Sequence, residues 1–342
     1  MKYSFKNDYG EGAHPRVLEN LVKFNDTQEP GYGLDSYSAR AKELLQEKIQ
    51  NSRSEIYFVP GGTLANLLVI SSILRPHQAV LSASTGHIST NESFAIEATG
   101  HKVCTVETPD GKLTTELIKQ ALLNHMNIPH QGEIKLVYIS NSTELGTVYS
   151  ISELKEIFSF CKEKDLYLFL DGARLAHAIA DPSTSLSLKE VAENTDCFYF
   201  GGTKNGVMIG EAIVLNNPAF FEGFAYQLKQ RGGMLAKGRL LGIQFLTLLE
   251  DDLYLELATY ANTQALEIKR AFLNKGFPML SGTFTNQIFP ILPQKAIEKL
   301  SESFDFYIWK KIDEKHSAIR IITSWATPKE VTQDFINTIK SL

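Results

Sequence analysis

Short apolar runs that alternate with helical patterns constrain the fold of this chain more than any other feature of the sequence. Several runs are apolar at consecutive positions, as in strands that are buried on both faces. The runs cover residues 55–59, 78–83, 102–107, 134–140, 166–171, 197–200 and 211–215. Between them, residues 63–75 and 151–164 carry apolar side chains at spacings of three and four, which predicts helices. This alternation predicts an α/β fold with a mostly parallel sheet.

The pattern changes near residue 235, where a long helical region begins that ends at Gly276. Shorter signals follow it to the end of the chain: strands at 286–292 and 318–325, and a helix after Pro328. They predict a smaller C-terminal α+β domain. We therefore divide the chain into an N-terminal segment with an interface loop (1–45), a large domain (46–235) and a small C-terminal domain (236–342).

Charge and composition exclude several classes of function. The net charge of -5 gives no basic excess for a nucleic-acid partner, and lysine and arginine are too spread out for a membrane patch. No apolar run approaches the roughly 20 residues that cross a bilayer, and the first residues lack the apolar core of a signal peptide. The cysteines, Cys104, Cys161 and Cys197, form no CxxC motif. We expect a cytoplasmic protein without a bound metal.

The stretch VPGGTLANLL (59–68) predicts a place where an anion could bind. A strand ends, two glycines turn the chain, and a helix begins at about Thr63. Backbone N–H groups and the positive end of the helix dipole then face one point. Gly62 lets an anion approach the backbone, and Thr63 adds a hydroxyl. Taken alone, the stretch fits equally a tight turn capped by threonine, which is the commoner case.

An aspartate and a lysine follow two later strands. Asp171 closes the run 166–171, and Lys204 lies just after the run 197–200 in FYFGGTKNG. If these strands are adjacent and parallel, both side chains lie at the same edge of the sheet. A partly buried lysine tends to lose its proton, and a neutral amine can condense with an aldehyde. The alternatives are an ion pair between Asp171 and Arg174, and a lysine that donates to loop carbonyls.

The three features together match pyridoxal 5'-phosphate (PLP). Its phosphate suits a helix start, its ring nitrogen suits a carboxylate, and its aldehyde suits a lysine amine. The chain in fact resembles the low-specificity threonine aldolases, which are fold-type-I PLP enzymes of the β-eliminating lyase family. The resemblance covers nearly the whole chain and rests on ordered motifs: PGGTLAN, TGHISTNES, ISNSTELGTVY, LFLDGARLAHA, YFGGTKNG, QRGGMLAKGR and AIRIITSW.

The resemblance implies an activity and an assembly. The activity is that of a carbon–carbon lyase, which cleaves L-threonine or L-allo-threonine to glycine and acetaldehyde through an aldimine on Lys204. The assembly is a homo-oligomer, a dimer or a tetramer with shared active sites, and the loop 30–38 would reach the neighbouring subunit. Two alternatives stay open: another PLP reaction on the same fold, such as β-elimination or racemisation, and a PLP-fold protein without activity.

The resemblance also assigns roles to single residues. Lys204, Asp171 and His87 are implied as catalytic, with His87 stacked on the pyridine ring. The implied cofactor-binding residues are Gly62, Thr63, His87, Asp171, Arg174, Lys204, Arg231 and Lys237, the last two with the phosphate, and the implied substrate-binding residues are Asn7, Arg174 and Arg320. No acidic residue surrounds Arg320 in HSAIRIITSWATP, so its partner must come from elsewhere.

The sequence departs from many of these relatives at three positions. Asn7 stands where many of them have serine, Asn91 stands where many have aspartate, and no histidine occurs near Thr143. These changes leave the cofactor chemistry intact. They leave open which group takes the proton of the substrate hydroxyl, with His87 as the first candidate.

Overall fold

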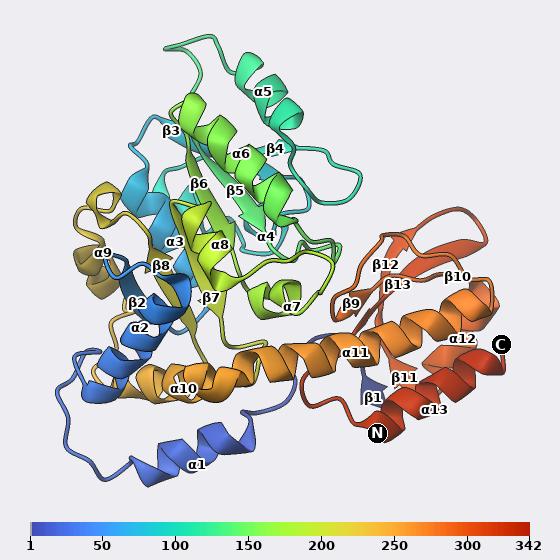
Figure 1. Ribbon diagram of the computed structural model, residues 1–342. Helices are drawn as coiled ribbons and strands as arrows, with labels where there is room; N and C mark the ends of the chain where they lie inside the picture. The colour runs from blue at the N-terminus through green and yellow to red at the C-terminus, as the bar shows by residue number, and fades with distance from the viewer. Residues whose placement is uncertain (1) are drawn as a thin grey trace.

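The computed structural model describes residues 2–342, and its centre is a seven-stranded sheet (Figure 1). The strand order is β2-β8-β7-β6-β5-β3-β4, and only β8 runs antiparallel to its neighbours. The predicted α/β class and the mostly parallel sheet are therefore confirmed. The strands are β2 (Glu55–Val59), β3 (Gln78–Ala83), β4 (Val103–Val106), β5 (Glu133–Ser140), β6 (Tyr167–Asp171), β7 (Cys197–Gly201) and β8 (Glu211–Leu215).

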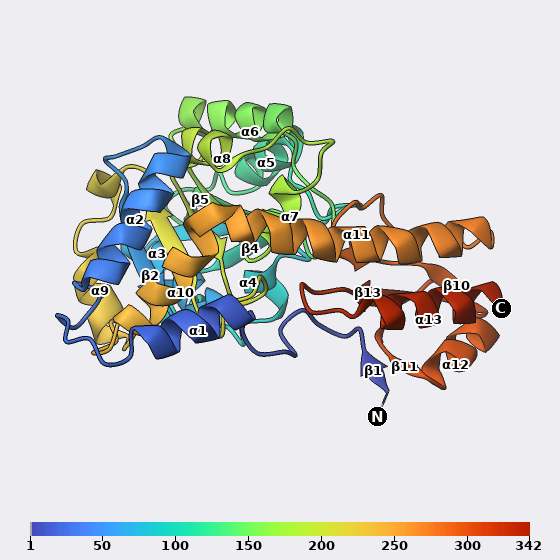
Figure 2. The same ribbon diagram turned by 60° about the horizontal axis from the view of Figure 1, so that its bottom comes forward.

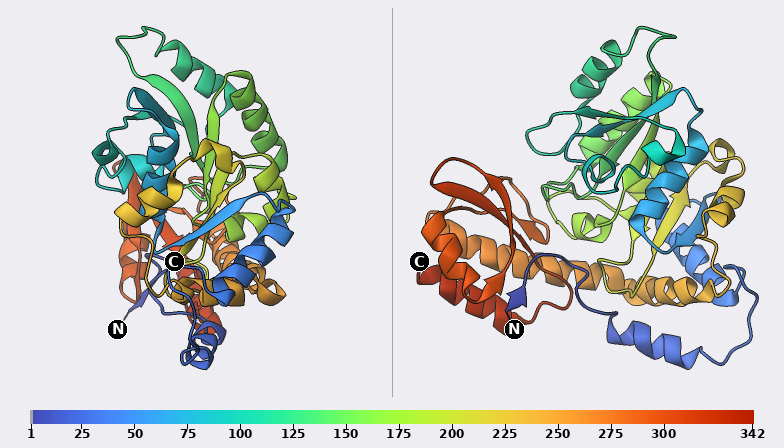
Figure 3. Two further views of the ribbon diagram at one scale, coloured as in Figure 1. Left: turned by 90° about the vertical axis from the view of Figure 1, so that its left-hand side faces the viewer. Right: turned by 180° about the vertical axis from the view of Figure 1, so that it is seen from behind.

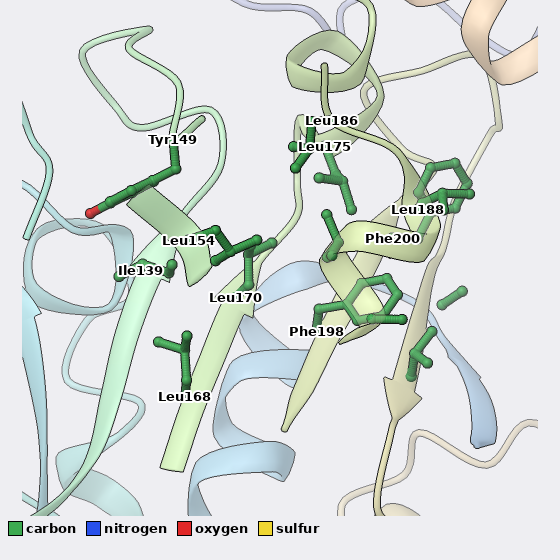
Figure 4. Close-up of a cluster of buried hydrophobic side chains, with 14 of the residues drawn as sticks. Ile139, Tyr149, Leu154, Leu168, Leu170, Leu175, Leu186, Leu188, Phe198 and Phe200 are labelled. Atoms are coloured by element: carbon green, nitrogen blue, oxygen red, sulfur yellow. The ribbon is translucent and has the colours of Figure 1, made fainter. Parts of the chain in front are cut away.

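Helices cover both faces of this sheet, because alternate side chains of each strand point to opposite faces. Phe198 and Phe200 of β7 pack with Leu168 and Leu170 of β6 on one face, as Figure 4 shows. Phe169 packs into the cluster on the other face. The first cluster involves α2 (Ser36–Ile49), α5 (Thr115–Leu123), α6 (Ile151–Glu163), α7 (Leu175–Ile179), α8 (Leu188–Glu193) and α10 (Arg239–Leu249); the second involves α3 (Gly62–Ile73), α4 (His87–Thr90) and α9 (Phe224–Gln230).

One long helix connects the large sheet to the small domain. The predicted helical region after residue 235 forms α10, a short turn η3 (Glu250–Asp252) and α11 (Leu253–Asn274). The break falls at Asp251 and Asp252, whose φ angles are 53° and 54°. The first turns of α11 pack into the core under the large sheet, while residues from Ala265 onward belong to the core of the small domain. Figure 2 shows α11 running from one part of the molecule to the other.

The small domain is a four-stranded antiparallel sheet packed against helices (Figure 3). The predicted strand at 286–292 is divided at Pro290, which lacks the N–H that a ladder needs. The N-terminus also lies here, because β1 pairs with β11 and Phe5 is buried in this core. The elements are β1 (Tyr3–Ser4), β9 (Gln287–Ile288), β10 (Ile291–Pro293), α12 (Gln294–Ser301), β11 (Phe304–Asp305), β12 (Tyr307–Lys311), β13 (His316–Ile322) and α13 (Lys329–Lys340).

The buried clusters divide the chain differently from the boundaries at residues 45 and 235. Residues 239–258 pack with the large sheet, and Phe5 packs with the small domain, so contacts between distant segments decide both placements. The division into three units stays a prediction. The other elements are α1 (Pro15–Lys23), η1 (Glu97–Thr99) and η2 (Pro218–Phe220). No helix among residues 2–342 has the length and apolar character needed to cross a membrane.

Glycines let the loops after β6 and β7 approach each other closely. A Cβ on Gly172 would lie 1.9 Å from the carbonyl oxygen of Tyr199, and one on Gly201 would lie 2.5 Å from that of Ala173. Because neither residue has a Cβ, the two backbones come close enough for the Gly201 N–H to donate to the Gly172 carbonyl at 3.0 Å. Gly172, just after β6, and Gly201, the last residue of β7, therefore determine how close the two strand ends come.

We predict that Gly172→Ala destabilises the protein, because the added methyl group must push the β7 backbone away. The free energy of unfolding should fall by about 1–3 kcal/mol, as in other overpacked sites. Urea unfolding at equilibrium measures it. Gly282→Ala is the matched control, because a Cβ there meets no atom within 4 Å. Equal stability of the two variants would contradict the prediction.

Candidate active site

Asp171 and Lys204 meet at one edge of the large sheet. Asp171 is the last residue of β6, and Lys204 follows β7, which ends at Gly201. The two strands are adjacent and parallel, with Leu170 opposite Phe198. Their carboxyl ends therefore lie side by side, which is where open α/β sheets bind their ligands.

Asp171 is buried and surrounded by hydrogen-bond donors. Tyr138 and Tyr199 each donate a hydroxyl to its carboxylate at 2.5 Å, and Asn66 donates its amide at 3.2 Å. Burial alone would raise the pKa of Asp171, but the nearby His87 and these donors lower it below its usual value. Asp171 is therefore an ionised carboxylate. It makes no ion pair with Arg174, so the structural alternative from the sequence is not observed.

Lys204 is half-buried and makes no hydrogen bond or ion pair with any residue from 2 to 342. The alternative of a lysine that donates to loop carbonyls is therefore not observed. Burial lowers the pKa of Lys204 below its ordinary value, and the charge of Arg174 lowers it further. Glu211 lies nearby on β8 and accepts the Gly202 N–H at 2.9 Å, and burial raises its pKa to about 7. Its surroundings thus shift Lys204 towards the neutral amine, which is the nucleophilic form.

Arg174 forms a buried ion pair with Asp8, a residue that the sequence analysis did not single out. Arg174 Nε and Nη2 lie 2.7 and 3.0 Å from the two carboxylate oxygens of Asp8. Asn286 of the small domain donates its amide to Asp8 at 2.9 Å. Burial would raise the pKa of Asp8, but Arg174 holds it well below the usual range. The pair joins the N-terminal segment, the large sheet and the small domain.

His87 begins α4 and is held by two acidic side chains that the sequence analysis also missed. Its Nδ1 lies 2.8 Å from Oε1 of Glu92, and its backbone N–H donates to Glu144 at 3.0 Å. Asn66 donates to the same Glu92 oxygen at 2.7 Å and thereby links His87 to Asp171. Burial and the charge of Asp171 raise the pKa of Glu144. Each of these residues lies inside a motif quoted above, which is the signal that could have identified it.

Arg320 projects from β13 of the small domain and has no acidic partner among residues 2–342. Its Nη2 donates to Oε1 of Gln287 at 2.6 Å, and its guanidinium lies 5.0 Å from the centre of the Trp309 ring. Its Nε is buried without a hydrogen-bond partner. Burial lowers the pKa of Arg320 to about 10, and Arg174 contributes to the shift. The arginine is thus still protonated at neutral pH.

The expected anion site lies at the start of α3. Gly62 is the first residue of the helix, whose N-terminus has no side-chain cap, and a Cβ there would lie 3.1 Å from the Tyr199 hydroxyl. Thr63 is exposed. Arg231 and Lys237 are exposed as well, and Arg231 reaches Ser71 at 3.4 Å.

Asn7 and the loop 30–38 are the functional candidates in the N-terminal part of the chain. Asn7 is half-buried and accepts the Tyr9 N–H at 3.1 Å. The predicted interface loop 30–38 packs on the segment before α10, where the Tyr32 N–H donates to the Ala236 carbonyl at 3.1 Å. The loop and Lys237 therefore lie close together in one subunit.

His177 is a further residue that the sequence analysis missed, although it lies in the motif LFLDGARLAHA. Its ring is buried in α7, and neither ring nitrogen has a hydrogen-bond partner. Burial lowers its pKa to about 4, opposed by Asp8 and assisted by the charges of Arg174 and Lys204. A neutral imidazole therefore lies beneath the charged groups of the site.

The fold and these paired strand ends define a PLP-dependent enzyme of fold type I. The chain belongs to the beta-eliminating lyase family, which it matches over residues 20–294. It is 32% identical to the low-specificity L-threonine aldolase of Pseudomonas aeruginosa over 340 residues, 98% of this chain and 96% of that protein. A threonine aldolase structure from Leishmania major superposes with a TM-score of 0.97, at 44% identity and 99% coverage of both chains.

A more distant likeness shows the fold alone. An aspartate aminotransferase mutant from Thermus thermophilus has a TM-score of 0.74 at 16% identity, and the match covers 100% of this chain and 92% of that one. Family membership makes the chain a lyase and PLP its cofactor. The resemblance stated from the sequence motifs is thereby confirmed.

We predict that His177 makes the protein less stable in acid. The unfolded chain binds a proton on this ring near pH 6.5, whereas the folded protein binds it only near pH 4. The contribution is therefore complete above pH 6.5 and is lost as the pH falls through 4, a change of about 3 kcal/mol. His177→Gln should flatten this dependence in urea unfolding between pH 7.5 and 4.5. The exposed His130→Gln is the control, and parallel curves for wild type and His177→Gln would disprove the assignment.

Proposed function

We propose that this protein cleaves L-threonine and L-allo-threonine to glycine and acetaldehyde, with PLP as its cofactor. The observation that carries the proposal is the pair formed by Asp171, ionised by its donors, and Lys204, an amine without a partner at the neighbouring strand end. The relatives named above support the choice of substrate.

The residues present fit the cofactor. PLP needs an anion site, a carboxylate and a free amine, and the uncapped start of α3 at Gly62, Asp171 and Lys204 supply groups of these kinds. We propose that Gly62 and Thr63 hold the phosphate, that Asp171 holds the ring nitrogen, and that Lys204 provides the amine. When bound, the cofactor supplies an aldehyde and an electron-withdrawing ring that weaken the Cα–Cβ bond of the substrate.

We propose that Arg320 and Arg174 have different roles on the side of the site that binds the substrate carboxylate. Arg320 keeps its charge, because its partner Gln287 is neutral, and a guanidinium binds a carboxylate through two hydrogen bonds. Arg174 is already neutralised by Asp8, so we propose that it acts by holding Asp8 and the N-terminal segment in place beside the carboxylate. Asn7, next to Asp8, would complete the carboxylate side of the site. Orientation of the carboxylate also orients the bond that breaks.

Cleavage of the Cα–Cβ bond requires a base that accepts the proton of the β-hydroxyl. We propose His87, because its Nδ1 is bound to Glu92, which leaves Nε2 as the nitrogen that can accept a proton. The β-hydroxyl proton moves to Nε2 as the Cα–Cβ bond breaks and acetaldehyde leaves. The electron pair stays with Cα, which later takes up a proton and becomes the CH₂ of glycine. Such a base contributes on the order of 10²- to 10⁴-fold to the rate.

We also propose a homo-oligomer, a dimer or a tetramer, in a cytoplasmic location. Arg231 and Lys237 are exposed in the single subunit, and Lys237 lies beside the loop 30–38, so we propose that the two residues complete the phosphate site of a neighbouring subunit. Cys104, Cys161 and Cys197 are all free and buried, which suits a reducing compartment. The activity would link this protein to glycine metabolism.

We predict that Lys204→Ala loses nearly all turnover while the fold is kept, because it removes the amine that the reaction uses. Acetaldehyde and glycine formed from L-threonine measure the activity, and circular dichroism measures the fold. Lys189→Ala is the matched control, since Lys189 pairs only weakly with Glu193 on α8 at 3.9 Å. Further product assays distinguish the alternatives: 2-oxobutyrate and ammonia from L-threonine would indicate β-elimination, and D-allo-threonine would indicate racemisation. Wild-type turnover in Lys204→Ala would reject the proposed role.

We predict that activity depends on assembly through the loop 30–38. Tyr32→Asp and Leu34→Asp place charges on two exposed side chains of this loop, and the double variant should sediment as a smaller species with lost turnover. Val22→Asp, an exposed apolar residue on α1, is the control for added surface charge. Sedimentation velocity at several protein concentrations measures the assembly. A monomeric double variant with full activity would show that each subunit holds a complete site.

A further inference from the structure

Gln287 connects two parts of the site that belong to different domains. It lies in β9 and is fully buried. Its Oε1 accepts from Arg320 Nη2 at 2.6 Å, and its Nε2 donates to the Thr143 carbonyl at 3.2 Å. A guanidinium only donates and a carbonyl only accepts, so both partners require the same orientation of the amide. A glutamine satisfies both, whereas a glutamate or a methionine cannot.

The segment that carries Gln287 is attached to the loop 143–146 of the large domain by further hydrogen bonds. The hydroxyl of Ser281 donates to the Leu145 carbonyl at 2.8 Å, and Thr283 donates to the Gly146 carbonyl at 2.7 Å. Gly146 has a φ of 75°, and a Cβ there would lie 2.9 Å from the Gln287 carbonyl oxygen. These hydrogen bonds and the close approach at Gly146 therefore hold the two segments together.

The loop 143–146 also holds His87, through the side chain of Glu144. Glu144 follows Thr143 and accepts both the His87 backbone N–H at 3.0 Å and the Ser140 hydroxyl at 2.8 Å. A continuous chain of bonds thus runs from Arg320 through Gln287 and the loop to His87. It joins the residue proposed to bind the substrate carboxylate to the residue proposed to accept the hydroxyl proton.

The charges of the two arginines explain why the partner is a neutral amide. Arg174 is neutralised by Asp8 at 2.7 Å, so it carries no free charge for a ligand. Arg320 is held by Gln287 and by the face of Trp309, neither of which is charged. Its Nε also retains an unused donor. A glutamate at position 287 would form an ion pair with Arg320 and would thereby compete with the substrate carboxylate.

We propose that Gln287 is a positioning residue that makes the site selective for α-carboxylates. It orients Arg320 without neutralising its charge. It also fixes the position of Arg320 relative to the loop 143–146, which holds His87. This inference rests on the proposed function, because Arg320 is the carboxylate-binding group of that function. It adds a residue whose side chain hydrogen-bonds to Arg320 and to the Thr143 carbonyl.

Kinetics of the holoenzyme test this role. Gln287→Glu should raise KM for L-threonine about 10- to 100-fold, because its carboxylate competes for Arg320, and should also lower kcat, because a carboxylate cannot donate to the Thr143 carbonyl. Gln287→Met also loses the link to the loop that holds His87 and should lower kcat, but it should raise KM less, because it adds no competing charge. Arg320→Lys should raise KM similarly, and the double variant Arg320→Lys with Gln287→Glu should cost less than the sum of the two. Gln264→Glu on α11, a buried glutamine outside the site, is the matched control.

Fluorescence gives a second readout that does not depend on turnover. Trp309 and Trp325 are the tryptophans of the chain, so Trp325→Phe leaves only the indole beside Arg320. The probe is 3-hydroxybutyrate, which has the carboxylate and β-hydroxyl of threonine but no amine. In the Trp325→Phe background the probe should change the Trp309 emission, and Gln287→Glu should raise the half-saturating concentration at least 10-fold.

The outcomes separate this inference from the proposed function. If the wild type forms no acetaldehyde, the proposed function fails, whereas a wild-type KM in Gln287→Glu of an active enzyme overturns the role of Gln287 alone. Unchanged half-saturation in the fluorescence titration also overturns it. Absence of any response of Trp309 to the probe overturns it too, because Arg320 would then bind no carboxylate.

Discussion

Asp171 keeps its negative charge inside the protein because hydroxyls and an amide surround it, and the rest of the site depends on that charge. Tyr138 and Tyr199 come from the two strands beside β6, and both donate at 2.5 Å. A buried carboxylate without such donors would be very costly. The same low-dielectric surroundings push the neighbouring Lys204 towards its neutral form. One environment thus keeps an anion at Asp171 and lowers the pKa of the amine on the adjacent strand end, which is the combination that the proposed chemistry needs.

The small domain and the N-terminal segment complete the site through two arginines in contrasting environments. Arg174 is locked to Asp8, which the N-terminal segment brings in beside Asn286. Arg320 faces only the neutral Gln287 and the ring of Trp309. Arg174 therefore joins parts of the architecture, while Arg320 keeps its charge for a ligand. The difference lies in the partners and not in the residue type.

Much of the sheet and part of the site could be predicted from the sequence. The apolar runs at 166–171 and 197–200 predicted two strands of a mostly parallel sheet, and the structure shows that β6 and β7 are adjacent and parallel. That pairing alone places Asp171 and Lys204 at one edge. The sequence could not identify Asp8 as the partner of Arg174, because 166 residues separate them. Nor could it show that α10 packs under the large sheet, because its apolar pattern fits a core in either domain.

Local sequence by itself determined where strands end, where glycines permit close approach, and which side chains could carry chemistry. These depend on periodicity and on backbone sterics, which act over a few residues. Only the tertiary structure decided the charge state and the partners of those side chains. Burial and long-range contacts set the pKa of Lys204, tie His87 to Glu92 and leave Arg320 without an acid. Electrostatic energies depend on what surrounds a group in space, and that environment exists only once the chain has folded.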